Sequence, residues 1–117
     1  DKVTLFYKTE YKNIKYQSKY ELYFLQYIEK LNKLDKIEPG PKIQYIDIDG
    51  KEHTYFVDFK IKNTNIVFEI KSDYYWNRKL ETNIIKMKTT SKYFNYIKAI
   101  LHVNLFGLIS KTLLNTI

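Results

Sequence analysis

The amino-acid sequence predicts an α/β domain in which one helix precedes three strands, a second helix and a fourth strand. Apolar residues recur at helical spacing after Ser18, and the segment Glu38-Pro39-Gly40-Pro41 then breaks the chain. Downstream of this break, apolar and polar residues alternate as they do in strands. With 117 residues, 44% of them hydrophobic, the chain suffices for one compact core, so we treat residues 1–117 as a single domain.

The first helix is expected over about residues 18 to 34. Ser18 and Glu21 have the spacing of a capping box, in which each side chain accepts a hydrogen bond from a backbone amide at the helix start. Apolar residues follow Glu21 at i+3, i+4 and i+7, which places this glutamate on the stripe that faces the sheet. Glu21 therefore has two interpretations, a helix cap or a carboxylate that needs a partner on the sheet.

The three strands are expected from Lys42 to Ile48, from Lys51 to Lys60 and from Ile66 to Lys71. Asp49-Gly50 is typical of a two-residue hairpin turn of the primed type, and residues 62–65 supply a second turn. The β-branched residues of the third segment favour a central strand. Together these strands predict an antiparallel meander.

The second helix is expected from Arg78 to about Tyr93, because this segment has helix-compatible residues and neither glycine nor proline. Tyr96 to Val103 has the pattern of a fourth strand. Leu105 to Ile117 is apolar at helical spacing and predicts a short terminal helix, or part of an interface.

The net charge of +7 favours a polyanionic partner, although a lysine-rich surface also serves solubility alone. Arg78 is the one arginine among 20 basic residues, so contacts to a nucleic-acid backbone are expected more than reading of base edges. The absence of cysteine indicates an intracellular protein, in the cytoplasm or nucleoid of a host cell and not secreted. No apolar run approaches the roughly 20 residues that cross a bilayer, and no glycine-rich loop predicts a nucleotide cofactor.

The candidate chemistry lies on the third strand. Strand alternation puts Glu69 and Lys71 on one face, and antiparallel pairing brings Asp58 beside Glu69. Two carboxylates can hold a hard divalent cation, and a lysine beside them can orient water or stabilise charge on a phosphate. The other interpretation is a cross-strand ion pair on an exposed sheet. A rival register would use Asp47 with Asp58 and Lys60.

The two histidines, His53 and His102, have no second histidine or cysteine at ligand spacing. A zinc centre is therefore not expected, and both are interpreted as ordinary strand residues.

These motifs resemble the PD-(D/E)XK nuclease superfamily, from about Tyr16 to Val103. The resemblance is carried by a helix with a glutamate, then Tyr55-Phe56-Val57-Asp58-Phe59, then Ile66-Val67-Phe68-Glu69-Ile70-Lys71-Ser72. It is strongest to the very-short-patch-repair-like and homing endonuclease branch. Val57 replaces the proline of the motif at a structural position. The segment after Lys71 lacks the histidine of the mismatch-repair enzymes, so mismatch repair is not implied.

The resemblance implies a restriction-endonuclease-like αβββαβ core, with a mixed central sheet flanked by helices. It implies Mg²⁺ bound by Asp58, Glu69 and the carbonyl of Ile70, with Mn²⁺ as a substitute. It also implies water activation at Lys71 and a catalytic contribution from Glu21, which matches the helical glutamate of the family.

The implied function is that of a metal-dependent DNA endonuclease, a homing-type enzyme of a phage or other mobile element. A non-catalytic nucleic-acid-binding module on the same fold and a junction-resolving nuclease are the alternatives. A homodimer is compatible with the resemblance. The first residue is not Met, which is compatible with a fragment and with an additional DNA-recognition domain outside this chain.

The substrate-contact segment is expected directly after the catalytic strand. It combines aromatic rings with cations, which suits unstacked bases and the sugar-phosphate backbone. The alternative is that Tyr75 or Trp76 packs over the end of the sheet. For Lys86 and Lys88 a solvated helix face is favoured over phosphate contact. The expected contact residues are Tyr75, Trp76, Asn77, Arg78 and Lys79.

Overall fold

A mixed four-stranded sheet forms the centre of the molecule in the computed structural model, which describes residues 10–101 and 117. Its strands lie in the order β3-β6-β7-β8, with β7 and β8 parallel and the other neighbours antiparallel. The predicted α/β class with a mixed central sheet is therefore confirmed. The strands are β3 (Ile37–Pro39), β6 (Phe59–Ile61), β7 (Ile66–Ser72) and β8 (Asn95–Leu101).

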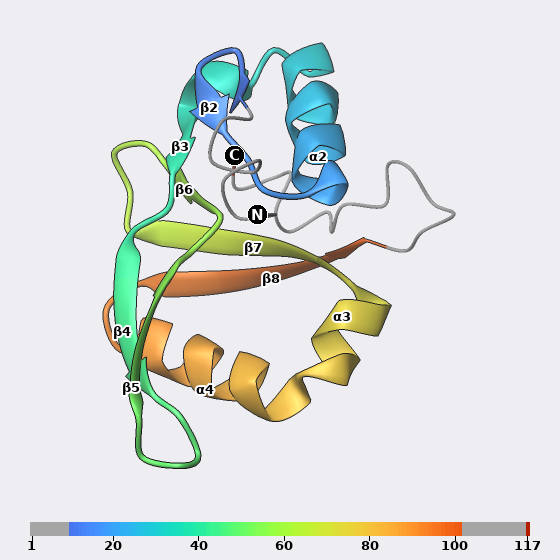
Figure 1. The fold of residues 1–117 in the computed structure, drawn as a ribbon. Helices are drawn as coiled ribbons and strands as arrows, with labels where there is room; N and C mark the ends of the chain where they lie inside the picture. Colours follow the sequence, from blue (N-terminus) through green and yellow to red (C-terminus); the bar gives the residue numbers. More distant parts are fainter. Residues whose placement is uncertain (1–9, 102–116) are drawn as a thin grey trace.

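Helices cover both faces of this sheet (Figure 1). Helix α2 (Lys19–Lys30) lies on one side, and α3 (Asp73–Arg78) and α4 (Leu80–Thr90) lie on the other. The apolar stripe predicted for the first helix is confirmed, because its three apolar members are buried together with Glu21. Phe24 stacks on Phe59 at 5.5 Å between ring centroids and meets Phe68 edge-on at 5.2 Å. Burying each such ring stabilises the fold by roughly 1.5–3 kcal/mol.

A long two-stranded ribbon bends where it leaves the central sheet. One strand continues from β3 into β4 (Lys42–Ile46), and its partner runs from β5 (Glu52–Phe56) into β6. At the bend the Gly40 amide donates to the Asp58 carbonyl at 3.3 Å, and the Val57 amide donates to the Pro41 carbonyl at 3.0 Å. A Cβ on Gly40 would lie 2.0 Å from the Val57 carbonyl oxygen, so the crossing requires glycine. The sequence analysis missed β3 because Pro39 and the following Gly40 suggested a break.

The bend corrects two predictions about the sheet. The continuous strand expected from Lys51 to Lys60 is interrupted at Val57 and Asp58, where it divides into β5 and β6. The expected three-stranded meander is also wrong, because β4 and β5 form a separate hairpin and only β6 continues beside β7. Side chains of β4 and β5 reach α4: the Tyr55 hydroxyl donates to the Lys86 carbonyl at 3.3 Å.

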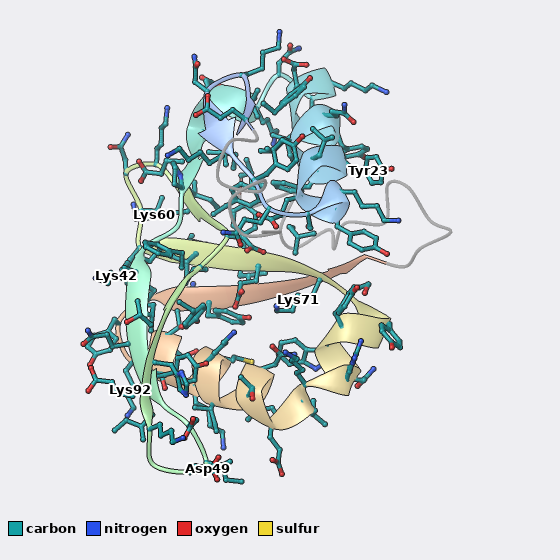
Figure 2. All side chains as sticks on the ribbon, in the orientation of Figure 1. Tyr23, Lys42, Asp49, Lys60, Lys71 and Lys92 are labelled. Carbon is teal, nitrogen blue, oxygen red and sulfur yellow. The ribbon has the colours of Figure 1, made fainter. Side chains whose placement is uncertain are left out.

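The hairpin between β4 and β5 has a different turn from the one expected. The Gly50 amide donates to the Asp47 carbonyl at 3.0 Å, and the Asp47 amide donates to the Lys51 carbonyl at 2.9 Å. Gly50 has φ of 81°, whereas Asp49 is not among the residues with positive φ. A primed type I turn needs positive φ at both central residues. The loop is therefore a type I turn followed by a left-handed glycine, and Figure 2 shows Asp49 at its tip.

The remaining helices and turns agree with the sequence in part. The second helix expected from Arg78 to about Tyr93 corresponds to α4, whereas α3 was not expected. The Ser72 hydroxyl caps α3 by accepting the Tyr75 amide at 3.2 Å. Lys79, with φ −123° and ψ 46°, separates α3 from α4. Short elements not expected from the sequence are β1 (Glu10–Tyr11), β2 (Ile14–Lys15) and the 3-10 helix η1 (Leu34–Lys36).

The predicted terminal helix from Leu105 lies outside the described residues, apart from Ile117, which is buried in the core under α2. His102 and the end of the predicted fourth strand lie outside them as well. None of the helices in the described part of the chain has both the length and the apolar character that crossing a bilayer requires.

Candidate active site

The candidate site begins where β6 turns away from β7. The two strands pair at Phe59 with Phe68 and at Lys60 with Val67. Toward the C-terminal end of β7, the bend takes the neighbouring strand away. Beyond it the Asp58 carboxylate accepts the Ile70 amide at 2.8 Å. The side chain thus takes the position that a backbone carbonyl would occupy in a continuous ladder. Because the amide and carbonyl of one strand residue point to the same side, the Ile70 carbonyl is directed to this open edge too.

Glu69 is held on the face of β7 opposite α2. It is 3% exposed, and its Oε1 accepts the Tyr96 hydroxyl at 2.9 Å. Burial and then the neighbouring Glu69 carboxylate raise the pKa of Tyr96, so this tyrosine remains a proton donor. The sequence analysis missed Tyr96. The signal lies in the parallel register, because Val67 pairs with Tyr96 and alternation puts Glu69 on that same face.

Glu21 lies both in the helix cap and on the buried stripe of α2. The Ser18 hydroxyl caps α2 by accepting the Glu21 amide at 3.2 Å, so the capping pattern is real. The Glu21 side chain is nevertheless buried at 7% exposure on the sheet-facing stripe. Burial raises its pKa, while hydrogen bonds from Ser18 and the Gln17 backbone, and the charge of Lys71, act in the opposite direction.

Asp58 lies at the centre of a cluster of like charges. Burial raises its pKa well above the ordinary value, and repulsion by Glu21 and Glu69 raises it further. The Ile70 amide and the Lys71 ammonium partly oppose these effects. The four predicted catalytic residues are thus close enough to interact electrostatically. A cation among these carboxylates would relieve both the repulsion and the cost of burial.

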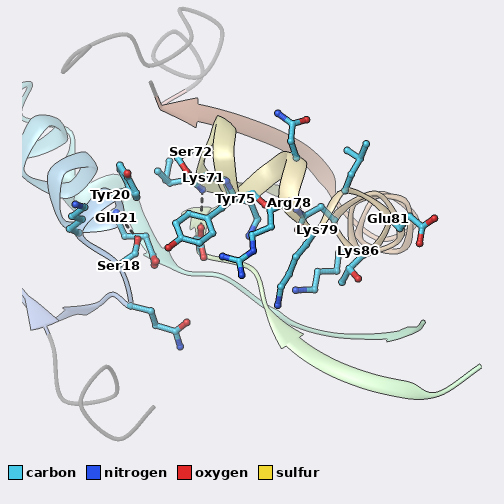
Figure 3. Close-up of a pocket in the computed structure, with 18 of the residues that line it drawn as sticks. Ser18, Tyr20, Glu21, Lys71, Ser72, Tyr75, Arg78, Lys79, Glu81 and Lys86 are labelled. Carbon is cyan, nitrogen blue, oxygen red and sulfur yellow. Dashed lines mark hydrogen bonds between the residues drawn. The ribbon is translucent and has the colours of Figure 1, made fainter. Parts of the chain in front are cut away.

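An open groove of about 1440 Å³ lies in front of these groups. Its walls come from the start of α2, the open edge of β7 and the helices α3 and α4. Figure 3 shows Glu21 on one side of this space and Arg78, Lys79 and Lys86 on the other. Glu69 is buried behind the lining residues. The groove therefore has the Glu21 and Asp58 carboxylates together with Lys71 on one side, and Arg78, Lys79 and Lys86 on the other.

Four residues of the predicted contact segment line the groove, and the fifth is buried. Tyr75, Asn77, Arg78 and Lys79 line the groove, and Tyr75 is 55% exposed. Trp76 is buried at 7% exposure, so its predicted stacking on a base is corrected: its ring packs inside, as the alternative interpretation stated.

Lys86 was expected on a solvated helix face, and its position differs most from what the sequence predicted. Its side chain is half-buried in the groove, and its ammonium lies 4.9 Å from the ring centroid of Tyr55 and 5.7 Å from that of Tyr45. Lys88, two residues later on α4, is exposed as expected. Helical spacing alone did not show which side of α4 meets the hairpin.

The rival register, in which Asp47 would act with Asp58 and Lys60, is not supported. Lys60 forms an ion pair with Glu38 at 3.0 Å on the other side of β6. Asp47 belongs to the hairpin turn, where its carboxylate accepts the amides of Asp49 and Lys51 at 2.9 Å and pairs with His53. His53 is therefore a partner of the Asp47 carboxylate.

The residues at the open edge of β7 fit a hard divalent cation that keeps part of its water shell. Among residues 10–101 and 117, no three His, Cys, Asp or Glu side chains come together as a complete metal cluster. Mg²⁺ does not require one, because it is commonly bound by one or two carboxylates together with waters and phosphate oxygens. Asp58, Glu69 and the carbonyl of Ile70 supply such a partial set.

Comparison of the chain with protein-family models, with curated proteins and with solved structures gives no match.

Proposed function

We propose that this chain is a Mg²⁺-dependent DNA endonuclease of the PD-(D/E)XK type, with a restriction-endonuclease-like core formed by α2, the bent ribbon, β7, α4 and β8. One observation carries the proposal. The Asp58 carboxylate is anchored on the Ile70 amide, between the positions of Glu69 and Lys71, in the part of β7 beyond its pairing with β6. The alternative, a cross-strand ion pair that only stabilises the sheet, does not account for the groove in front of these residues.

Asp58, Glu69 and the carbonyl of Ile70 would hold the ion. When bound, Mg²⁺ polarises the scissile phosphate and lowers the pKa of water. The protein's own contribution is orientation. The Ile70 amide fixes Asp58 and the Tyr96 hydroxyl fixes Glu69, so neither carboxylate must reorganise during the reaction.

Lys71 is the residue proposed to act on the reacting groups. It follows Glu69 by two positions on the same face of β7, lines the groove and lies between the sheet and α3 in Figure 2. Its ammonium can orient the attacking water and stabilise the charge that develops on the phosphate. Glu21, at the start of α2, is close enough to Lys71 to interact with it electrostatically and limits the net positive charge at this end of the groove.

DNA is the proposed substrate because the charge of +7 includes Arg78, Lys79 and Lys86 along the same groove. Nearly all of the cations are lysines, which favours backbone contact over base reading. A homing-type role in a phage or other mobile element, with Mn²⁺ replacing Mg²⁺, belongs to the same proposal. It rests on the resemblance of the motifs.

The test is cleavage of supercoiled plasmid, linear duplex and branched DNA in Mg²⁺, Mn²⁺ or chelator. Lys71→Met should lower the rate by about 10²–10³-fold or more, the range found when one charge-stabilising donor is removed. Lys60→Met is the matched control, because Lys60 lies on the neighbouring strand and is paired with Glu38. It should cleave like the wild type.

The outcomes separate the alternatives. Metal-dependent cleavage lost only in Lys71→Met supports the proposal, and a strong preference for branched DNA would identify a junction-resolving enzyme. DNA binding without cleavage in either metal would identify a non-catalytic binding module. Equal activity of the two variants would show that Lys71 is not part of the chemistry.

A further inference from the structure

Lys86 is held in the groove by aromatic rings rather than by a carboxylate. Tyr45 comes from β4 and Tyr55 from β5, and the two rings meet edge-on at 5.7 Å between centroids. The Lys86 ammonium lies within cation-π distance of both. Among residues 10–101 and 117 its Nζ has no hydrogen-bond acceptor and no salt bridge, and Lys86 lines the groove.

Tyr55 is itself fixed to the helix that carries the lysine, and Tyr45 packs within the hairpin. The Tyr55 hydroxyl donates to the Lys86 carbonyl at 3.3 Å and is hydrogen-bonded to Thr90, a fully buried residue of α4. The Tyr45 ring also stacks on His53 at 5.4 Å. Long lysine side chains normally lose much conformational freedom on binding. Here the rings restrict the side chain before a ligand arrives.

The charges that face Lys86 make an anion the natural occupant. Burial, and then the ammonium of Lys71, lower the pKa of Lys86, and Lys79 acts in the same direction. The carboxylates of Glu69 and Asp58 oppose this shift without pairing with the ammonium. Figure 3 shows Lys79 and Lys86 beside each other in the groove. An anion placed there would reduce the repulsion among these cations.

We propose that Lys86, held over Tyr45 and Tyr55 and assisted by Lys79, forms a second phosphate subsite that binds a backbone phosphodiester group adjacent to the one cleaved. That one phosphate is cleaved rests on the proposed nuclease function. Phosphate binding at Lys86 rests on the cations and rings alone. The two hydroxyphenyl rings exclude water from one side of the ammonium. This strengthens its attraction to a phosphate on the other side.

The experiment measures affinity for a short DNA duplex over a range of salt concentrations, in chelator and again with Ca²⁺. Lys86→Met should bind several-fold more weakly, and its slope of log K against log salt should fall by about one contact. Lys88→Met removes the same charge from an exposed position of the same helix and should change neither quantity. Urea denaturation confirms that both variants are folded.

A second measurement identifies the phosphate. Duplexes that carry a single neutral methylphosphonate at successive positions are bound to the wild type and to Lys86→Met. At one position the substitution should weaken the wild type and leave Lys86→Met unchanged, because the contact is already missing.

Loss of affinity in Lys86→Met but not in Lys88→Met, together with one such position, supports the subsite, even for a protein that proves inactive as a nuclease. Equal affinities of the two variants, no coupled position, or no DNA binding by the wild type would overturn it. Cleavage lost in Lys71→Met with unchanged binding by Lys86→Met would leave the nuclease proposal standing alone.

Discussion

The two halves of β7 have opposite roles although they belong to one strand. In the first half, Val67 and Phe68 are fully buried, with β6 on one side and β8 on the other. In the second half, β8 continues but β6 has turned away, and the Asp58 side chain takes its place beside Ile70. A site can therefore form where one neighbouring strand turns away while the rest of the sheet keeps its geometry.

Burial of side chains contributes to the free energy of folding with opposite sign in the two halves. Burying the apolar side chains of the first half stabilises the fold. The second half buries Glu69, with the buried Glu21 and the half-buried Asp58 nearby, which costs free energy unless hydrogen bonds or a cation compensate. The apolar half supplies the rigidity that holds the charged half in an arrangement it would not adopt alone.

The largest effect on this difference is expected from Gly40→Ala, because it acts on the bend that separates the halves. The new Cβ would lie 2.0 Å from the Val57 carbonyl oxygen, a backbone atom that cannot rotate away. We expect a loss of about 3 kcal/mol in the free energy of unfolding, measured with urea, and loss of cleavage.

Gly50→Ala is the control for Gly40→Ala. Gly50 has positive φ but no atom within 4 Å of its Cβ position, so the cost should be about 1–2 kcal/mol of backbone strain with cleavage retained. Equal losses in the two variants would show that the bend does not require close approach at Gly40.

A smaller effect is expected from Tyr96→Phe, which acts on the charged half alone. The variant removes the hydroxyl that donates to Glu69 and leaves a buried carboxylate with one partner fewer. The expected loss is about 1–3 kcal/mol in urea denaturation, with slower cleavage because Glu69 is no longer oriented. Tyr93→Phe, at a tyrosine that is 68% exposed, should change stability by less than about 0.5 kcal/mol. Unchanged stability of Tyr96→Phe would indicate that water replaces the hydroxyl.

The smallest effect is expected from Glu21→Gln and depends on pH. The pKa of Glu21 is raised in the folded state by burial, so its ionised form destabilises the fold. This cost is fully present above the raised pKa and disappears below the ordinary glutamate value of about 4.3, where both states are protonated. Glu21→Gln should therefore be more stable than the wild type at pH 8, and the difference should shrink as the pH falls toward 4.

Glu81→Gln provides the comparison for Glu21→Gln. Glu81 is an exposed acidic residue in the first turn of α4, where a carboxylate is favourable. No gain at high pH is expected for this variant. A gain in Glu21→Gln that is the same at pH 4 and pH 8 would contradict the role assigned to burial.

Local patterns in the sequence were sufficient for the parts that depend on neighbours in the chain. The apolar and β-branched content of residues 66–71 correctly predicted a strand, because such side chains suit a pleated and largely buried surface. Ser18 correctly predicted the start of α2, since a cap and the amide it accepts lie three residues apart. The four candidate catalytic residues were found from such patterns.

Contacts between distant segments could not be read in this way. The tertiary structure decided that Gly40 crosses Val57 and divides the expected strand into β5 and β6, that β8 brings Tyr96 to Glu69, and that α4 turns Lys86 toward Tyr45 and Tyr55. Each depends on packing between elements far apart in the chain, which a local period does not encode. The sequence by itself therefore determined the strand and helix that carry the candidate groups, and the tertiary structure alone decided where β7 is left open and which cation stands beside it.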